Sequence, residues 1–216
     1  MTALRFLNQL ERRPTILCLG AHCDDIEIGC GGTLLRILKA RRDVTVRWIV
    51  LSSTKERALE ATAAAQLFLK GARARTVRIE AFADGYFPYQ GPEIKRYFEG
   101  LKRTVSPNLI FTHYRDDRHQ DHRLVSDTTW QTFRNSVILE YEIPKYDGDL
   151  GVPNVFAHLN AAICQQKVRY ILRSYRTQRA KPWFTEETLR ALMRLRGVES
   201  RAPRYAEAFY GRKLIL

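Results

Sequence analysis

The sequence contains no run of eighteen or more apolar residues. Its first fifteen residues, MTALRFLNQLERRPT, carry charge where a secretory leader needs an uninterrupted apolar core. A membrane-spanning helix needs about 20 apolar residues and a leader needs that core, so we expect a cytoplasmic protein without a transmembrane segment. The four cysteines include no CxxC pair. Because this is not the pattern of a disulfide framework, we expect reduced thiols.

Internal repeats and low-complexity linkers are also absent. Nothing in the sequence therefore marks a domain boundary. The chain has 216 residues and 45% hydrophobic residues, which is enough to bury a full core. The sequence predicts one domain that covers residues 1–216.

The charge is strongly one-sided, with a formal net charge of +13. Most of the excess lies in residues 167–216, where arginines alternate with aromatic residues, a composition that also suits nucleic acid. The arginines, however, are spaced like the solvated faces of amphipathic helices. We expect no obligate nucleic-acid partner, and an acidic or phosphorylated ligand stays open.

Short apolar, β-branched runs alternate with helical patterns along the chain. Strands are predicted at residues 15–21, 44–53, 75–82, 107–114, 136–143, 154–159 and 211–216. Helices are predicted at residues 32–42, 55–71 and 92–103, and two basic helices follow around residues 168–179 and 189–197. This alternation predicts an α/β, three-layer Rossmann-like fold, in which a mostly parallel central sheet is flanked by helices. In such sheets the ligand binds at the carboxyl ends of the strands.

Ionisable side chains cluster after two of these predicted strands. The first cluster, in AHCDDIE, contains His22, Asp24 and Asp25. The second, in THYRDDRHQDHR, contains three of the chain's five histidines. A lone histidine or an Asp-Asp pair is usually structural, but two such clusters at one edge of a sheet favour a functional site. Two histidines and a carboxylate are a ligand set that suits catalytic zinc or ferrous iron.

The two clusters also resemble a known family. AHCDDIEIGCGG is similar to the N-terminal signature of the LmbE-like, or PIG-L, zinc-dependent N-deacetylases, AHPDD followed by glycines, and DRHQDHR resembles their HxDH element. The similarity continues through KERALEATAAAQ, YEIPKYDGDLGVPN and RGVESRAPRYAEAFYGRKL. The resemblance implies a zinc enzyme whose metal ligands are His22, Asp25 and His122. It implies Asp24 as the general base, His119 as an imidazole that protonates the leaving amine or holds the oxyanion, and Asp121 as the residue that orients it.

The resemblance further implies an N-acetylated amino sugar as substrate, free or in a glycoconjugate, with Arg57 and Asp84 in contact with it. Cys23 replaces the usual proline, and we interpret it as structural. Asp117 stands where some relatives carry an oxyanion-binding tyrosine, which leaves Tyr114 and Tyr141 as candidates.

Several alternatives stay open at this point. Gly29, Gly31 and Gly32 could cradle a phosphate at a helix N-terminus, although tight packing is the preferred interpretation. Residues 141–160 are expected to form one wall of the site. A metal-dependent phosphoester hydrolase, a non-catalytic nucleotide-binding or nucleic-acid-binding module, and a homo-oligomer are all compatible with the sequence.

Overall fold

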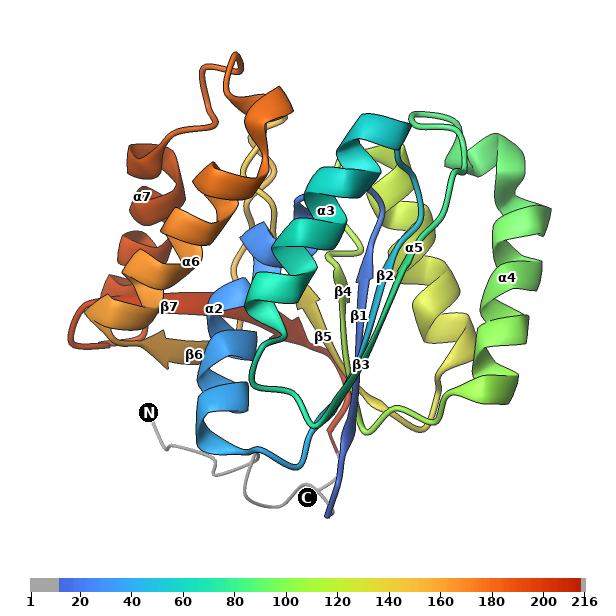
Figure 1. Cartoon of the computed structure of the whole chain (residues 1–216), viewed down its shortest axis with the longest axis horizontal. Coiled ribbons are helices and arrows are strands. Elements are labelled where there is room, and N and C mark those ends of the chain that lie inside the picture. Colours follow the sequence, from blue (N-terminus) through green and yellow to red (C-terminus); the bar gives the residue numbers. More distant parts are fainter. Residues whose placement is uncertain (1–11, 215–216) are drawn as a thin grey trace.

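A seven-stranded mixed sheet forms the centre of the computed structural model, which describes residues 12–214 (Figure 1). The strands are β1 (Thr15–Gly20), β2 (Thr45–Val50), β3 (Ala74–Ile79), β4 (Leu109–His113), β5 (Val137–Tyr141), β6 (Val155–Leu159) and β7 (Tyr205–Gly211). Their order is β3-β2-β1-β4-β5-β7-β6, and the first five strands are parallel. Strand β7 runs antiparallel between β5 and β6. The predicted α/β fold with a mostly parallel sheet is confirmed.

Helices cover both faces of this sheet (Figure 1). Helices α2 (Asp25–Ala40), α3 (Lys55–Phe68), α6 (Ala161–Ser174) and α7 (Glu186–Glu199) pack into one apolar cluster. Helices α4 (Gly91–Thr104) and α5 (Gln120–Thr132) pack into a second cluster on the other face. Two short 3₁₀ turns, η1 (Phe87–Gln90) and η2 (Arg176–Gln178), complete the elements. Strand β1 is buried from its second residue onward because it is central and covered on both faces.

Two predicted boundaries were wrong. The last strand lies at Tyr205–Gly211, not at residues 211–216, because the alternating side chains of YAEAFYG fit between β5 and β6. Residues 212–214 form no strand, and residues 215–216 lie outside the described part. Helix α2 begins at Asp25 rather than at Gly32, so the glycine cluster is helical.

Two side chains from distant parts of the chain bind the backbone of helix α2. Glu207 Oε1 accepts the N–H of Gly32 (2.7 Å), and Oε2 accepts the N–H of Thr33 (2.6 Å). Lys167 Nζ donates to the carbonyl of Ile28 (2.6 Å) and to Glu207 (2.6 Å). In a regular helix the Ile28 carbonyl would pair with the Gly32 N–H. The backbone groups that were considered as a phosphate cradle therefore bind an internal carboxylate.

The same glycines allow close packing. A Cβ on Gly29 would lie 2.2 Å from Tyr141 Cδ2, and one on Gly31 would lie 2.6 Å from Phe68 Cε1. Tyr141 is fully buried and donates its hydroxyl to the Leu19 carbonyl (2.6 Å), so its ring cannot move away from α2. The packing interpretation of the glycines agrees with these distances.

All four cysteines are free and buried, as expected for reduced thiols. No helix within residues 12–214 carries an apolar stretch long enough to cross a membrane. One sheet joins elements from both ends of the described chain. That residues 1–216 form a single domain stays a prediction, because residues 1–11 lie outside the described part.

Candidate active site

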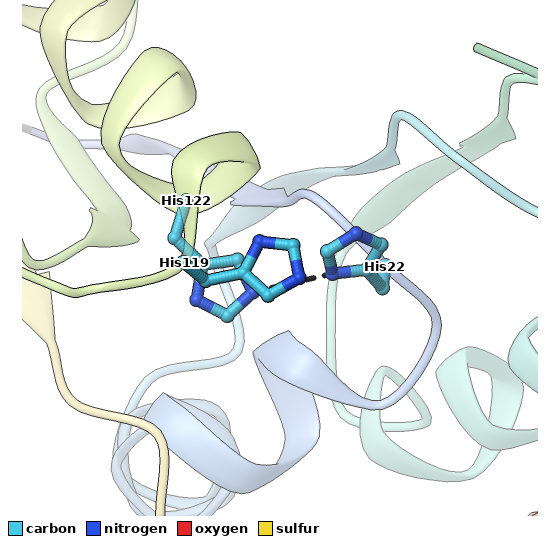
Figure 2. Close-up of side chains that lie close together, drawn as sticks. All are labelled: His22, His119 and His122. Atoms are coloured by element: carbon cyan, nitrogen blue, oxygen red, sulfur yellow. Dashed lines mark hydrogen bonds between the residues drawn. The ribbon is translucent and has the colours of Figure 1, made fainter. Parts of the chain in front are cut away.

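The two polar clusters meet at the carboxyl ends of the neighbouring parallel strands β1 and β4. His22, Asp24 and Asp25 follow β1, while His119 and His122 lie at the start of α5, after β4. Figure 2 shows the three imidazoles turned toward one another between the loop after β1 and the first turn of α5. All the predicted metal and catalytic residues are thus brought together, from segments about 100 residues apart.

His22 is held through its Nε2 atom. This atom lies 3.1 Å from Asp121 Oδ2 and 3.1 Å from Asp84 Oδ1, so Nε2–H donates to a carboxylate, and Nδ1 is the atom left to bind a second proton or a cation. Although burial lowers the pKa of His22, hydrogen bonds to Asp121, Asp25 and Asp84 raise it well above its usual value. The surroundings of His22 therefore favour a positive charge at Nδ1, either a second proton or a bound cation.

His122 is held in the opposite sense, through Nδ1. Its Nδ1–H donates to Asp117 Oδ2 (2.9 Å), which leaves the Nε2 lone pair free. Burial, with the nearby His113, lowers the pKa of His122 to about 4, so the ring is neutral near pH 7. Asp117 is itself 2% exposed and also accepts from Lys145 Nζ (2.9 Å). A carboxylate that fixes the tautomer of a histidine in this way is the usual partner of a metal ligand.

Three electron-pair donors consequently converge on one point. His22 Nδ1 lies 3.2 Å from His122 Nε2 and 3.6 Å from Asp25 Oδ2, and His122 Nε2 lies 3.7 Å from Asp25 Oδ2. Figure 2 marks the histidine pair with a dashed line. Ligand atoms about 2.0–2.1 Å from a tetrahedral zinc lie roughly 3.3 Å apart. A proton on His22 Nδ1 can be donated to His122 Nε2, and a cation in its place would be bound by atoms at the spacing of zinc ligands, so the residues fit zinc.

Two other histidines lie within ligand distance of this cluster, but their nitrogen lone pairs are engaged. His119 Nδ1 accepts the backbone N–H of Asp121 (3.2 Å), and His113 Nε2 accepts that of Ala21 (2.9 Å). For His119 to bind a metal through Nε2, a proton would have to sit on Nδ1, facing the Asp121 N–H. These contacts favour His22, Asp25 and His122 over the other combinations.

Asp121 contacts His119 through its backbone and not through its carboxylate. That carboxylate bonds to His22 and to the N–H groups of Gly85 (2.7 Å) and Phe87 (3.1 Å), because it faces the loop after β3. Asp121 holds His119 through its backbone N–H instead. Since Nδ1 is the acceptor, the proton of neutral His119 is on Nε2, where it can be donated. Burial and the nearby His22 lower the pKa of His119.

Asp24 has the properties of a general base. It is the N-cap residue of α2 with φ 94°, a left-handed conformation that costs a non-glycine residue energy and is typical of functional sites. Burial raises the pKa of Asp24 to about 7, and Asp25 adds to this, whereas Arg57 opposes it. Arg57 Nη2 lies 3.3 Å from Asp24 Oδ2, and Arg57 is in the first turn of α3 because Thr54 caps that helix. A carboxylate with a pKa near 7 suits proton transfer at neutral pH.

Other residues singled out from the sequence lie in less direct positions. The Asp84 side chain is 67% exposed, pairs with His22, and lies within 4.8 Å of ligand atoms of His119 and Asp121. Cys23 Sγ donates to Ser53 Oγ (3.2 Å), away from the convergent donors, which agrees with a structural role. Tyr114 stacks on Tyr210 with ring centroids 3.7 Å apart, and the Tyr141 hydroxyl is bound to Leu19, so neither of these tyrosines has a contact with the convergent donors.

Sequence reasoning missed the roles of Glu27 and Lys145. Glu27 is fully buried behind Asp24, accepts the hydroxyl of Tyr175 (2.5 Å), and burial raises its pKa to about 8. Lys145 lies within residues 141–160 and contacts Asp117, outside this segment, as well as Asp149 inside it (2.5 Å). The segment therefore borders the site, as expected. Only the i,i+4 spacing of Lys145 and Asp149 was visible in the sequence.

Comparison with known proteins then decides the family. Residues 17–133 match the family described as PIG-L, GlcNAc-PI de-N-acetylase. The chain belongs to the PIG-L family. It is 28% identical over 151 residues to the uncharacterized deacetylase YaiS of Escherichia coli K12, a match that covers 64% of this chain and 78% of YaiS. The resemblance seen in the sequence is confirmed.

Solved structures share the fold over nearly the whole chain. The N,N'-diacetylchitobiose deacetylase of Pyrococcus horikoshii is 20% identical with a TM-score of 0.71, covering 95% of this chain and 88% of that one. GalB, the 4-carboxy-2-hydroxymuconate hydratase of Pseudomonas putida KT2440, is 17% identical with a TM-score of 0.75, covering 94% and 98%. The fold carries two different reactions in these neighbours. Membership of the PIG-L family, rather than the fold, is what supports a hydrolase of N-acetyl groups.

Proposed function

We propose that this PIG-L family member is a zinc-dependent deacetylase that releases acetate, or a similar small acyl group, from the nitrogen of an amino sugar. The convergence of His22 Nδ1, Asp25 Oδ2 and His122 Nε2 within 3.7 Å of one another carries the proposal. Ferrous iron accepts the same donor set. When bound, zinc lowers the pKa of water and polarises a carbonyl oxygen.

The chain's own residues supply the proton transfers. Asp24 takes a proton from the attacking water, and the adjacent Arg57 balances its charge when it is ionised. His119 Nε2–H donates a hydrogen bond to the oxyanion while its Nδ1 accepts the Asp121 N–H, and the proton that Asp24 took from water passes to the departing nitrogen. Carboxylates Asp117 and Asp121 hold the two histidine ligands in the required tautomers. The products are acetate and a free amine.

Arg57 and Asp84 are proposed to contact the sugar, because both lie beside the catalytic groups and Asp84 is solvent-accessible. The description of the PIG-L family and the chitobiose deacetylase neighbour both concern N-acetylglucosamine derivatives. We propose that residues 1–216 form one domain. We also propose that the protein acts in the cytoplasm, where its four free cysteines stay reduced.

Acetate and free-amine release from a panel of N-acetylglucosamine derivatives tests the proposal. The zinc-loaded parent is compared with Asp24→Asn, and zinc is counted in both proteins. Release by the parent alone, with equal zinc in both, is the expected result.

Other outcomes identify the alternatives. Full zinc without acetate release contradicts the deacetylase, and release of phosphate from phosphorylated sugars would then favour a phosphoester hydrolase. Addition of water to an unsaturated acid would favour a hydratase like GalB. Absence of zinc binding would remove the metal site altogether, and salt-sensitive nucleic-acid binding that chelators do not change would favour a binding module.

A further inference from the structure

A cavity that is separate from the candidate active site lies between the last turn of α4 and the strands β2 and β3. Its volume is about 110 Å³. One water molecule needs only about 10–15 Å³ of such space, so the cavity is large enough for a group of several atoms. Its polar lining consists of Arg47 on β2, Thr76 and Arg78 on β3, and Thr104 on α4. We call it the arginine cavity.

The two arginines lie on the sheet face that packs against α4. Ile49 belongs to the apolar cluster beneath α4, and alternate residues of a strand point to the same face, so Arg47 faces α4 as well. On β1, the residue in register with Arg47 is the fully buried Leu17. On β3, the residues in register with Arg47 and Ile49 are Thr76 and Arg78. Polar groups therefore replace apolar ones on this part of the face.

Neither guanidinium forms an ion pair with a carboxylate within residues 12–214. Arg47 Nη1 donates to Thr76 Oγ1, and Arg78 interacts with the hydroxyl of Tyr97. That hydroxyl itself donates to Glu80 Oε1 (3.0 Å). Two positive charges on the walls of one cavity repel each other, and their partial removal from water adds a further cost. An anion in the cavity would offset both effects.

The end of α4 does not supply the missing partner. A helix C-terminus carries a partial negative charge, which attracts arginine side chains. The Leu101 carbonyl, however, accepts the N–H of Val105 (2.9 Å) and the hydroxyl of Thr104 (3.1 Å). Among the described residues, the one hydrogen bond of the Arg47 guanidinium goes to Thr76. Most of its N–H groups are thus left for a ligand.

The donors around the cavity suit a phosphate group. Guanidinium groups bind phosphate oxygens through paired, charge-assisted hydrogen bonds. The Thr76 hydroxyl accepts from Arg47 and keeps its own proton to donate. Ile49, Leu101 and Val105 form the apolar part of the lining, which keeps water from one side and strengthens the attraction of charges.

We propose that the arginine cavity binds a phosphate group, either as free inorganic phosphate or as part of a small phosphorylated metabolite. The strongly positive chain left such a ligand open, and the cavity gives it a place. The inference goes beyond the proposed deacetylase function and does not depend on it, because no proposed metal ligand or catalytic residue lines the cavity.

The test is a calorimetric titration of the zinc-loaded, full-length protein with inorganic phosphate at constant ionic strength. We expect saturable binding of a single phosphate per chain. Arg47→Gln and Arg78→Gln should each weaken the affinity by roughly tenfold or more, as expected for the loss of a hydrogen bond to a charged group. Arg78 is exposed, so its variant should fold even if Arg47→Gln does not.

A second titration, with glycerol 3-phosphate, distinguishes the two sources of the phosphate group. Tighter binding than that of inorganic phosphate, again weakened by Arg78→Gln, would identify a phosphorylated metabolite as the ligand. Equal or weaker binding would identify the free ion. Absence of saturable binding of both compounds would overturn the inference.

The matched control is Arg75→Gln. Arg75 is an exposed residue of the same strand, three positions before Arg78 and hence on the other face, where it donates to the Leu69 carbonyl (3.2 Å). This variant should keep the phosphate affinity of the parent. Equal weakening by Arg75→Gln and Arg78→Gln would mean unspecific attraction to a basic chain. Loss of binding in Arg57→Gln but not in Arg78→Gln would mean that phosphate occupies the catalytic site. Either result would overturn the inference.

Thermal unfolding separates a binding role of the arginines from a structural one. Without phosphate, Arg78→Gln should unfold at the same temperature as the parent or higher, because it removes one of two like charges. Added phosphate should raise the midpoint of the parent and of Arg75→Gln, but not that of Arg78→Gln. A lower midpoint for Arg78→Gln without phosphate, with the same rise on adding phosphate in all three proteins, would show that Arg78 is structural and that the inference is wrong.

Discussion

The change Asp117→Asn isolates the contact that sets the tautomer of His122. Asp117 accepts three bonds in the structure: from His122 Nδ1 (2.9 Å), from Lys145 Nζ (2.9 Å) and from the backbone N–H of His119 (2.8 Å). An asparagine of the same shape has one acceptor oxygen and one donor NH₂ group. If the oxygen keeps the His119 N–H, the NH₂ group faces two other donors. His122 then loses the acceptor that leaves its Nε2 free.

Loss of such a partner typically costs 10–100-fold in metal affinity, which equals about 1.4–2.7 kcal/mol. We expect Asp117→Asn to weaken zinc binding by this amount, because the competing tautomer of His122 places a proton where a cation is required. Zinc affinity is measured by competition with a chromogenic chelator after the metal has been removed. A second readout is the rise in the thermal unfolding midpoint when zinc is added. This rise should be smaller for Asp117→Asn, because stabilisation by a ligand depends on its affinity for the folded protein.

The neighbouring change Asp116→Asn is the matched control. The Asp116 side chain is 69% exposed and its partners are Arg115 (3.9 Å) and Tyr114, neither of which is a proposed zinc ligand, so the same chemical change there should leave zinc affinity unaltered. Equal zinc affinity for the parent and for a correctly folded Asp117→Asn protein would refute the reasoning. It would mean that His122 needs no fixed tautomer, or that it is not a ligand.

The sequence predicted the fold because the signals for it are local. The apolar run TILCLG and the capped, Ala-rich helix that starts at Lys55 need no distant partner to be recognised. Helix α2 was missed over its first two turns because GCGG reads as a loop. Glu207 and Lys167, far along the chain, bind the backbone of this glycine-rich stretch. A long-range contact of this kind has no local signal.

The candidate site, too, could be predicted from the sequence only in part. Residue types and strand ends predicted a metal site formed by the two clusters, and the resemblance to the family named His22, Asp25 and His122 as its ligands. Which nitrogen of each ring is free depends on Asp121 and Asp117, and therefore on three-dimensional geometry. The resemblance to the family implied that Asp121 orients His119, without saying through which of its atoms. The first turn of α5 directs the Asp121 carboxylate to His22.

Two further predictions concern packing and pH. Gly29→Ala places a methyl group 2.2 Å from the anchored ring of Tyr141 and should destabilise the protein by roughly 1–3 kcal/mol. Gly100→Ala, in α4 with nothing within 4 Å, should stabilise it by about 0.5–1 kcal/mol in urea unfolding; equal effects would contradict the packing argument. Burial raises the pKa of Glu27 from 4.5 to about 8. Between these values the folded chain keeps a proton that the unfolded chain releases, so Glu27 makes stability fall as pH rises through this window. Glu27→Gln cannot titrate and still offers an oxygen to Tyr175. Its stability relative to the metal-free parent should therefore increase between pH 5 and pH 8, with a slope of up to about 1.4 kcal/mol per pH unit. Parallel stability curves for the two proteins would show that Glu27 is already ionised in the folded chain, and that Asp24 works beside a second negative charge instead of a neutral carboxyl group.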